Sequence, residues 1–169
     1  MNELKRALAF TAALALVASG GGSTEDRERE LEREAAKHGL DADVELDDRG
    51  EVRSVEVKRS GQRIGQNLSL PDEFPSDVAV SDAWSVMHTT PAPQGGYMIQ
   101  ATTPDAVDAI LAETRAAMAA DGWSETAFDQ PTPQMTSLGF DKDDRLTRVT
   151  IIDAGDGQRS VQLVTMKKT

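Results

Sequence analysis

The sequence predicts an α+β fold, in which an antiparallel sheet carries one long amphipathic helix packed on one face, preceded by a small β-hairpin region and a charged N-terminal helix. Three observations lead to this prediction. Most segments after residue 41 alternate apolar and polar residues and end in turn-forming residues, as strands do. Within the main domain, one segment, 103–121, has apolar residues at helical spacing. The strands around it follow one another through short turns, which favours antiparallel pairing.

Composition excludes several classes of function. The chain has 169 residues, with 18 Lys and Arg against 29 Asp and Glu, a formal net charge of -11 and no cysteine. Nucleic acids and anionic membrane surfaces are disfavoured as partners, because each contact with a phosphate needs a cation. Without cysteine, disulfides, thiolate nucleophiles, Fe–S clusters and Cys-type zinc sites are excluded.

Residues 1–20 have the pattern of a signal peptide. Lys5 and Arg6 precede an apolar run over 7–18, and small residues follow at once. The run is too short to span a bilayer comfortably, since a spanning helix needs about 20 residues. We therefore expect an exported protein, located in the periplasm or tethered to the membrane in the cell envelope of a bacterium.

The end of this leader, Val17-Ala18-Ser19-Gly20, resembles the lipobox of bacterial lipoproteins, in which an apolar residue and two small ones precede a lipidated cysteine. Gly20 stands in the cysteine position, and glycine has no thiol to acylate. Either the ordinary signal peptidase cleaves here, or the natural protein has cysteine at position 20. Only in the second case does the resemblance imply contact with the membrane, through a lipid anchor.

Residues 21–40 read as a Gly/Ser tether and a charged helical stalk. The helix is predicted over 24–38, with Ser23 or Thr24 as N-cap and Gly39 after its end. Leu31 is its only large apolar residue, so we favour a solvated stalk over a coiled coil that binds a partner. Residues 41–69 form the β-hairpin region, with strands predicted at 43–46, 52–57 and 63–68.

Residues 70–169 are predicted to form the α+β domain. Its helix is expected to begin with Thr103 as N-cap and Pro104 as first helical residue, and to end at Asp121-Gly122. The apolar stripe of this helix consists of Val107, Ile110, Leu111, Thr114 and Met118. Strands are predicted at 83–90, 97–102, 123–128, 135–141, 146–152 and 159–166.

The motif Leu70-Pro71-x-x-Phe74-Pro75-x-Asp77-Val78 precedes two strands and a helix that opens with Thr-Thr-Pro-Asp. Together with the antiparallel strands after the helix, this order resembles a type of uncharacterised small bacterial envelope lipoprotein, over roughly residues 68–166. The resemblance implies location and fold. Its motifs are short and structural, and it implies no activity.

Few residues carry the pattern of a chemical site. Of the two histidines, His38 lies near the end of a predicted helix, and His88 shares a predicted strand face with Trp84 and Val86. No HExxH motif, phosphate loop or histidine beside a candidate serine occurs. We therefore predict no catalytic residue, no metal and no cofactor, and we take His88, Trp84 and Tyr97 as candidate interaction or ligand residues.

These observations favour a non-enzymatic envelope protein whose partner is another envelope protein, contacted through an uncovered sheet face or an edge strand. Two alternatives stay open. The first is a periplasmic protein that binds a small ligand or hydrolyses one, using carboxylates and His88. The second is a weak calcium-binding domain, whose candidate ligands are Asp141, Asp143, Asp153 and Asp156.

Overall fold

The computed structural model describes residues 23–92, 94–153, 155 and 157–168. The predicted signal peptide and Gly20 lie outside the described residues. The chain divides into two compact units, with the boundary between Gln66 and Asn67. No helix of the described part is long and apolar enough to span a membrane.

The first unit combines one helix with a three-stranded antiparallel sheet. Strand β2 lies between β1 and β3. The elements are α2 (Thr24–Lys37), β1 (Ala42–Leu46), β2 (Val52–Val57) and β3 (Gln62–Gly65). The turn between β1 and β2 contains Gly50, whose positive φ of 75° glycine adopts without strain.

Helix α2 packs against its own sheet, which differs from the solvated stalk expected from its composition. Ser23 caps the helix by accepting a hydrogen bond from the Asp26 amide. Leu31 and Ala35 are buried, and Ala35 belongs to a small apolar cluster together with Leu40. Because alanine has a short side chain, the helix can approach the strand closely even though most of its residues are charged.

The second unit contains six strands, all antiparallel to their neighbours, in the order β4-β5-β9-β8-β7-β6. One helix follows β5. The elements are β4 (Ser85–Pro91), β5 (Gly96–Thr103), α3 (Val107–Ala120), β6 (Ser124–Thr132), β7 (Met135–Lys142), β8 (Arg145–Asp153) and β9 (Arg159–Lys167).

The predicted α+β class, with one long helix covering a sheet, is wrong. The described residues form a predominantly antiparallel β structure with only two helices of 14 residues each. Helix α3 begins at Val107, because Thr103 still belongs to β5 and its hydroxyl accepts from the Asp105 amide. A helix is about 10 Å wide and strands are about 4.8 Å apart, so one helix covers about two strands.

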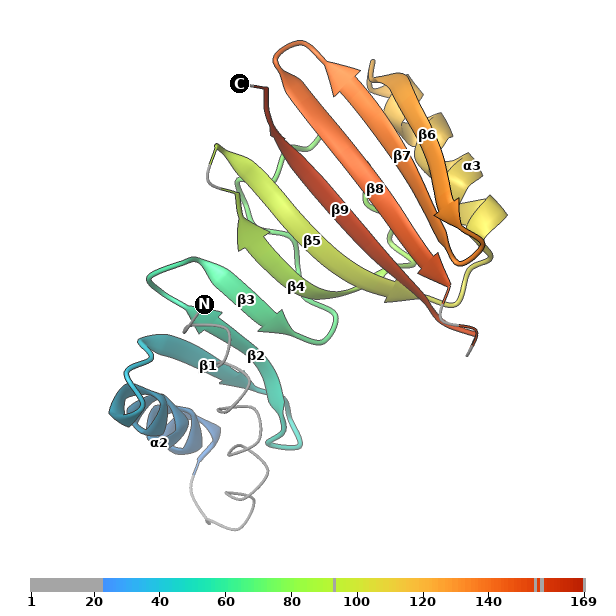
Figure 1. Ribbon diagram of the computed structural model, residues 1–169. Helices are drawn as coiled ribbons and strands as arrows, with labels where there is room; N and C mark the ends of the chain where they lie inside the picture. The colour runs from blue at the N-terminus through green and yellow to red at the C-terminus, as the bar shows by residue number, and fades with distance from the viewer. Residues whose placement is uncertain (1–22, 93, 154, 156, 169) are drawn as a thin grey trace. The chain divides into compact units, whose positions relative to one another are not determined.

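An irregular segment, residues 67–84, supplies the rest of the cover. Its buried side chains join those of α3 in one core cluster over the sheet; Figure 1 shows α3 behind β6 and β7. The cluster consists of Leu68, Phe74, Val78, Trp84, Val86, Ile99, Ala101, Ile110, Leu111, Met118, Trp123, Leu138, Phe140, Val149, Ile151, Val161 and Leu163. The connector with two prolines is therefore part of the core layer.

The opposite face of this six-stranded sheet is called the open face below. Alternation of burial along β5, β8 and β9 identifies the side chains that point to it. On these three strands they are Met98, Gln100, Thr102, Leu146, Arg148, Thr150, Ile152, Ser160, Gln162, Val164 and Met166. Met98 and Ile152 are each 38% exposed.

Candidate functional site

A β-bulge in β4 separates His88 from Trp84, although alternation along the strand predicted one shared face. Val86 pairs with Ala101, but the register shifts after it, so that His88 pairs with Gln100. Val86 is buried in the core, whereas His88 pairs with a residue of the open face. The prediction that His88 and Val86 share a face is wrong, because one extra residue in a strand reverses every side chain beyond it.

His88 lies half-buried in the sheet. Its Nε2 is 2.8 Å from the Thr90 hydroxyl oxygen, two residues along the same strand. Burial lowers the pKa of His88, because desolvation disfavours the imidazolium. Burial thus favours the neutral form of the ring.

Tyr97 points to the core side of β5. Its ring packs against Phe74 with the centroids 5.8 Å apart and the planes tilted by 51°. Burial, followed by the nearby Glu73 carboxylate, raises the pKa of Tyr97. Trp84 also lies on the core side, at 7% exposure. The structure thus does not bring His88, Trp84 and Tyr97 together at one site.

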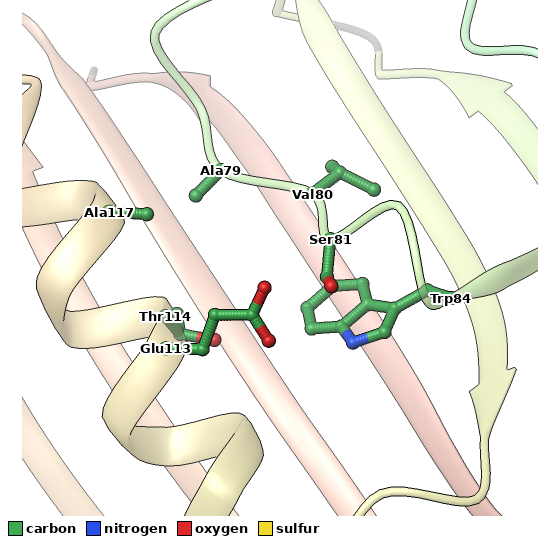
Figure 2. Close-up of a pocket in the computed structure, with 7 residues that line it drawn as sticks. All are labelled: Ala79, Val80, Ser81, Trp84, Glu113, Thr114 and Ala117. Atoms are coloured by element: carbon green, nitrogen blue, oxygen red, sulfur yellow. The ribbon is translucent and has the colours of Figure 1, made fainter.

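Trp84 lines a small pocket between residues 79–84 and α3. The pocket has a volume of about 50 Å³, and Glu113 supplies its only carboxylate. Figure 2 shows the lining residues, which are Ala79, Val80, Ser81, Trp84, Glu113, Thr114 and Ala117. The indole Nε1 of Trp84 is buried and has no hydrogen-bond partner among the described residues. Sequence reasoning missed this pocket, because Glu113 lies 29 positions from Trp84 and no motif links them.

A wider pocket lies along the proline-containing connector. Its volume is about 280 Å³, and its lining residues are Leu70, Pro71, Phe74, Pro75, Ser76, Val78, Ala79 and Val80. These residues are almost entirely apolar and include no carboxylate. His88 lines neither this pocket nor the smaller one. The two pockets therefore lack the combination of imidazole and carboxylates that hydrolysis would use.

An ion cluster around Asp77 ties the connector to the turn between β7 and β8. The Arg145 guanidinium donates to both carboxylate oxygens, at 2.8 Å to Oδ1, and Lys142 Nζ donates to Oδ2 at 2.6 Å. Trp123 Nε1 donates to the Asp77 carbonyl, and Arg145 lies 5.0 Å from the Trp123 ring centroid. The Arg145 guanidinium, followed by the Lys142 ammonium, holds the pKa of Asp77 well below its usual range against the effect of burial.

The candidate calcium ligands lie in ion pairs and turns. Asp141 pairs with Lys168 and Asp153 pairs with Arg159. Asp143 adopts a φ of 51° in the β7–β8 turn, and Asp156 lies outside the described residues. In the part of the chain that the structure describes, no group of three or more His, Asp or Glu side chains could hold a metal ion.

Comparisons with known proteins add no relative. No family model matches the chain, and neither the curated proteins nor the solved structures that were compared gave a match.

Proposed function

We propose that this protein is a non-enzymatic, exported cell-envelope protein that binds another envelope protein through the open face of its second unit. The single observation behind the proposal is the chemistry of that face. The outward positions of three neighbouring strands of the sheet, β5, β9 and β8, include no Asp or Glu, although the chain has 29 acidic residues. Arg148 is the only charged residue among these positions.

Such a composition is typical of a protein interface. Charged residues are depleted at the centre of interfaces, and methionine and arginine are enriched there. Met98 and Met166 lie on neighbouring strands of the open face, and Val164 lies between them on β9. The neighbouring side chains of β5 and β9 include Gln100 and Gln162, which pair across the two strands and can donate to and accept from a partner.

Export follows from the leader and stays part of the proposal. A short positively charged segment, an apolar run of 12 residues and small residues at the end of the run support it. Mass spectrometry of the mature N-terminus tests this step. A start at a small residue near Gly20 supports cleavage by the ordinary signal peptidase, and an uncleaved Met1 contradicts export by this route.

Site-specific photocrosslinking in the native envelope tests the binding face. A photoreactive amino acid at Gln162 is expected to yield one dominant protein adduct, and the same label at Ala116 on the exposed side of α3 is expected to yield none of it. Met98→Glu, placed next to the label at Gln162, introduces a charge into the interface and should reduce the yield of the adduct at least tenfold.

Two results would contradict the proposal. One is an equal yield from the Gln162 and Ala116 labels, which would indicate random collision. The other is an unchanged yield with Met98→Glu while the protein stays folded, because a partner seated on the open face cannot tolerate a buried unpaired carboxylate there.

A further inference from the structure

Methionines gather on the open face of the second unit. Among the methionines that the structure describes, Met118 is the one enclosed in the core, at 0% exposure. The others reach the open face, as their strand positions or contacts show: Met87, Met98, Met135 and Met166. Met87 and Met98 are 41% and 38% exposed. Small dissolved molecules can therefore reach these two side chains while the face is free.

Met98 differs from the other exposed methionine in its neighbours. Its sulfur accepts a hydrogen bond from Gln162 Nε2 at 3.7 Å, and its partner in the strand register is Val164. Met98 thus lies beside both a polar and an apolar residue of the proposed interface. Met87 instead lies at the bulge of β4, with its sulfur 3.8 Å from the Thr102 hydroxyl oxygen.

The thioether of an exposed methionine reacts with hydrogen peroxide without any catalytic group. A lone pair of the sulfur attacks one peroxide oxygen, the O–O bond breaks and an S–O bond forms. The sulfur loses two electrons to the peroxide, whose other oxygen leaves as hydroxide and takes the proton of the sulfur-bound oxygen to form water. The product, methionine sulfoxide, is polar, and sulfoxide reductases return it to methionine.

Oxidation of Met98 would change two properties that suit the open face to a partner. The apolar end of the side chain becomes a strong dipole, which costs free energy when it is buried against an apolar surface. The sulfoxide oxygen is also a stronger acceptor than a thioether sulfur. Gln162 Nε2 already donates to this sulfur, so the added oxygen competes with a partner for the same donor.

We propose that Met98 is a site of reversible oxidation by peroxides, and that its sulfoxide weakens the binding of a partner to the open face. The proposal rests on the protein-binding function proposed above and adds a means of controlling it. Met118 is the internal reference, because its sulfur is enclosed in the core, where the Ala79 amide donates to it at 3.4 Å.

Peptide mass spectrometry of the purified full chain in hydrogen peroxide tests how accessible each sulfur is. Met98 is expected to gain one oxygen at least about tenfold faster than Met118, because peroxide reaches the core sulfur only when the core opens. The circular dichroism spectrum should stay the same after Met98 has reacted. Equal rates at Met98 and Met118, or loss of the fold on oxidation of Met98, would overturn the proposal.

Photocrosslinking then tests the effect of oxidation on binding. The label is placed at Thr150, which pairs with Gln162 from β8, so that Gln162 keeps its amide. The labelled chain is treated with hydrogen peroxide, freed of it with catalase and added to envelope membranes. The yield of the dominant adduct is expected to fall at least about fivefold relative to the untreated chain, because a polar group now lies in the interface.

Met98→Leu identifies the sulfur that is responsible, since leucine keeps the apolar bulk and has no sulfur to oxidise. In this variant, peroxide should leave the yield at its untreated level. Met87→Leu is the matched control, because it makes the same change at the other strongly exposed methionine, and peroxide should still lower its yield. Sulfoxide reductases added to the oxidised chain should restore the adduct.

The failures of the two proposals are distinguishable. An adduct that forms from the untreated chain and is not reduced by peroxide would overturn the oxidation site alone. An equal fall with Met98→Leu would assign the effect to another group and would also overturn it. If the untreated chain gives no dominant adduct, the protein-binding function itself is contradicted, and the control by Met98 falls with it.

Discussion

One carboxylate, that of Asp77, joins two parts of the second unit that are distant in sequence. This carboxylate accepts three hydrogen bonds, one from Lys142 of β7 and two from Arg145 of β8. The backbone carbonyl of Asp77 accepts a further hydrogen bond from the Trp123 indole. The Asp77 side chain is 26% exposed, so solvent screens these interactions only in part. The cluster holds the connector with two prolines at the end of the sheet, where Phe74 and Val78 enter the core.

Replacing Asp77 by asparagine is expected to lower the free energy of unfolding by about 1–3 kcal/mol, because Arg145 and Lys142 lose a charged acceptor in a half-buried place. Urea denaturation followed by tryptophan fluorescence measures the change. Asp72→Asn, on the exposed part of the same segment, is the matched control and should change stability by less than about 0.5 kcal/mol. Equal effects of the two variants would remove the special role of Asp77.

The same carboxylate makes stability dependent on pH. The ordinary pKa of aspartate is 3.8, and the cations lower the pKa of Asp77 in the folded state. Its contribution is therefore complete above the unfolded value and is lost as pH falls below it, from about pH 5 to about pH 2. The difference in stability between the natural chain and Asp77→Asn should shrink over this window. A constant difference down to pH 2 would contradict the lowered pKa.

At the scale of elements, helix α2 shields the edge of the first sheet. An edge strand presents unpaired amides that can template the addition of another strand. In β1, the Leu46 amide donates to Glu28 at 2.9 Å and the Val44 amide to Glu32 at 3.4 Å. The sequence pattern predicted that these glutamates lie on a solvated helix face. In the structure, their carboxylates accept hydrogen bonds from backbone amides of the edge strand β1.

We expect Glu28→Ala to speed hydrogen exchange of the Leu46 amide about tenfold, which corresponds to the loss of one hydrogen bond to a charged acceptor. Hydrogen exchange followed by NMR measures this rate. Glu30→Ala, on the exposed side of the same helix, should leave it unchanged. If the Leu46 amide exchanges at the same rate in both variants as in the natural chain, its hydrogen bond is made to solvent and not to Glu28.

At the scale of the whole molecule, the two units differ in how much core they contain. The large cluster of buried residues lies entirely within Asn67–Thr169, whereas the small cluster of the first unit consists of Ala35, Leu40 and Ala42 with Val55 beside it. A core of that size supplies little stability, since domains below about 70–80 residues rarely gain more than 3–5 kcal/mol from their cores.

A fragment comprising residues 67–169 is therefore expected to fold on its own and to unfold cooperatively. Circular dichroism during thermal unfolding tests this, together with dispersed amide signals in NMR. A fragment comprising residues 23–66 is expected to show no cooperative transition. Loss of cooperativity in the larger fragment would show that its stability depends on the first unit.

Local features of the chain were predictable, because they depend on neighbouring residues. Ser23 caps α2, and Asp121 and Gly122 end α3, because capping is a matter of one or two residues. The start of α3 was predicted too early, since Thr103 fits both a helix cap and a strand end. In the structure, Thr103 pairs with Arg159 of β9 and is therefore the last residue of strand β5.

The sequence by itself determined the alternating strands, the turns between them and the scarcity of chemical groups, because each is a property of adjacent residues. Only the tertiary structure decided on which face His88 lies, that residues 67–84 share the cover of the sheet with α3, and that Glu113 lies opposite Trp84. The first depends on a single β-bulge, and the other two depend on contacts between segments that are distant in sequence. Neither a bulge nor a long-range contact produces a periodic pattern of apolar residues in the sequence.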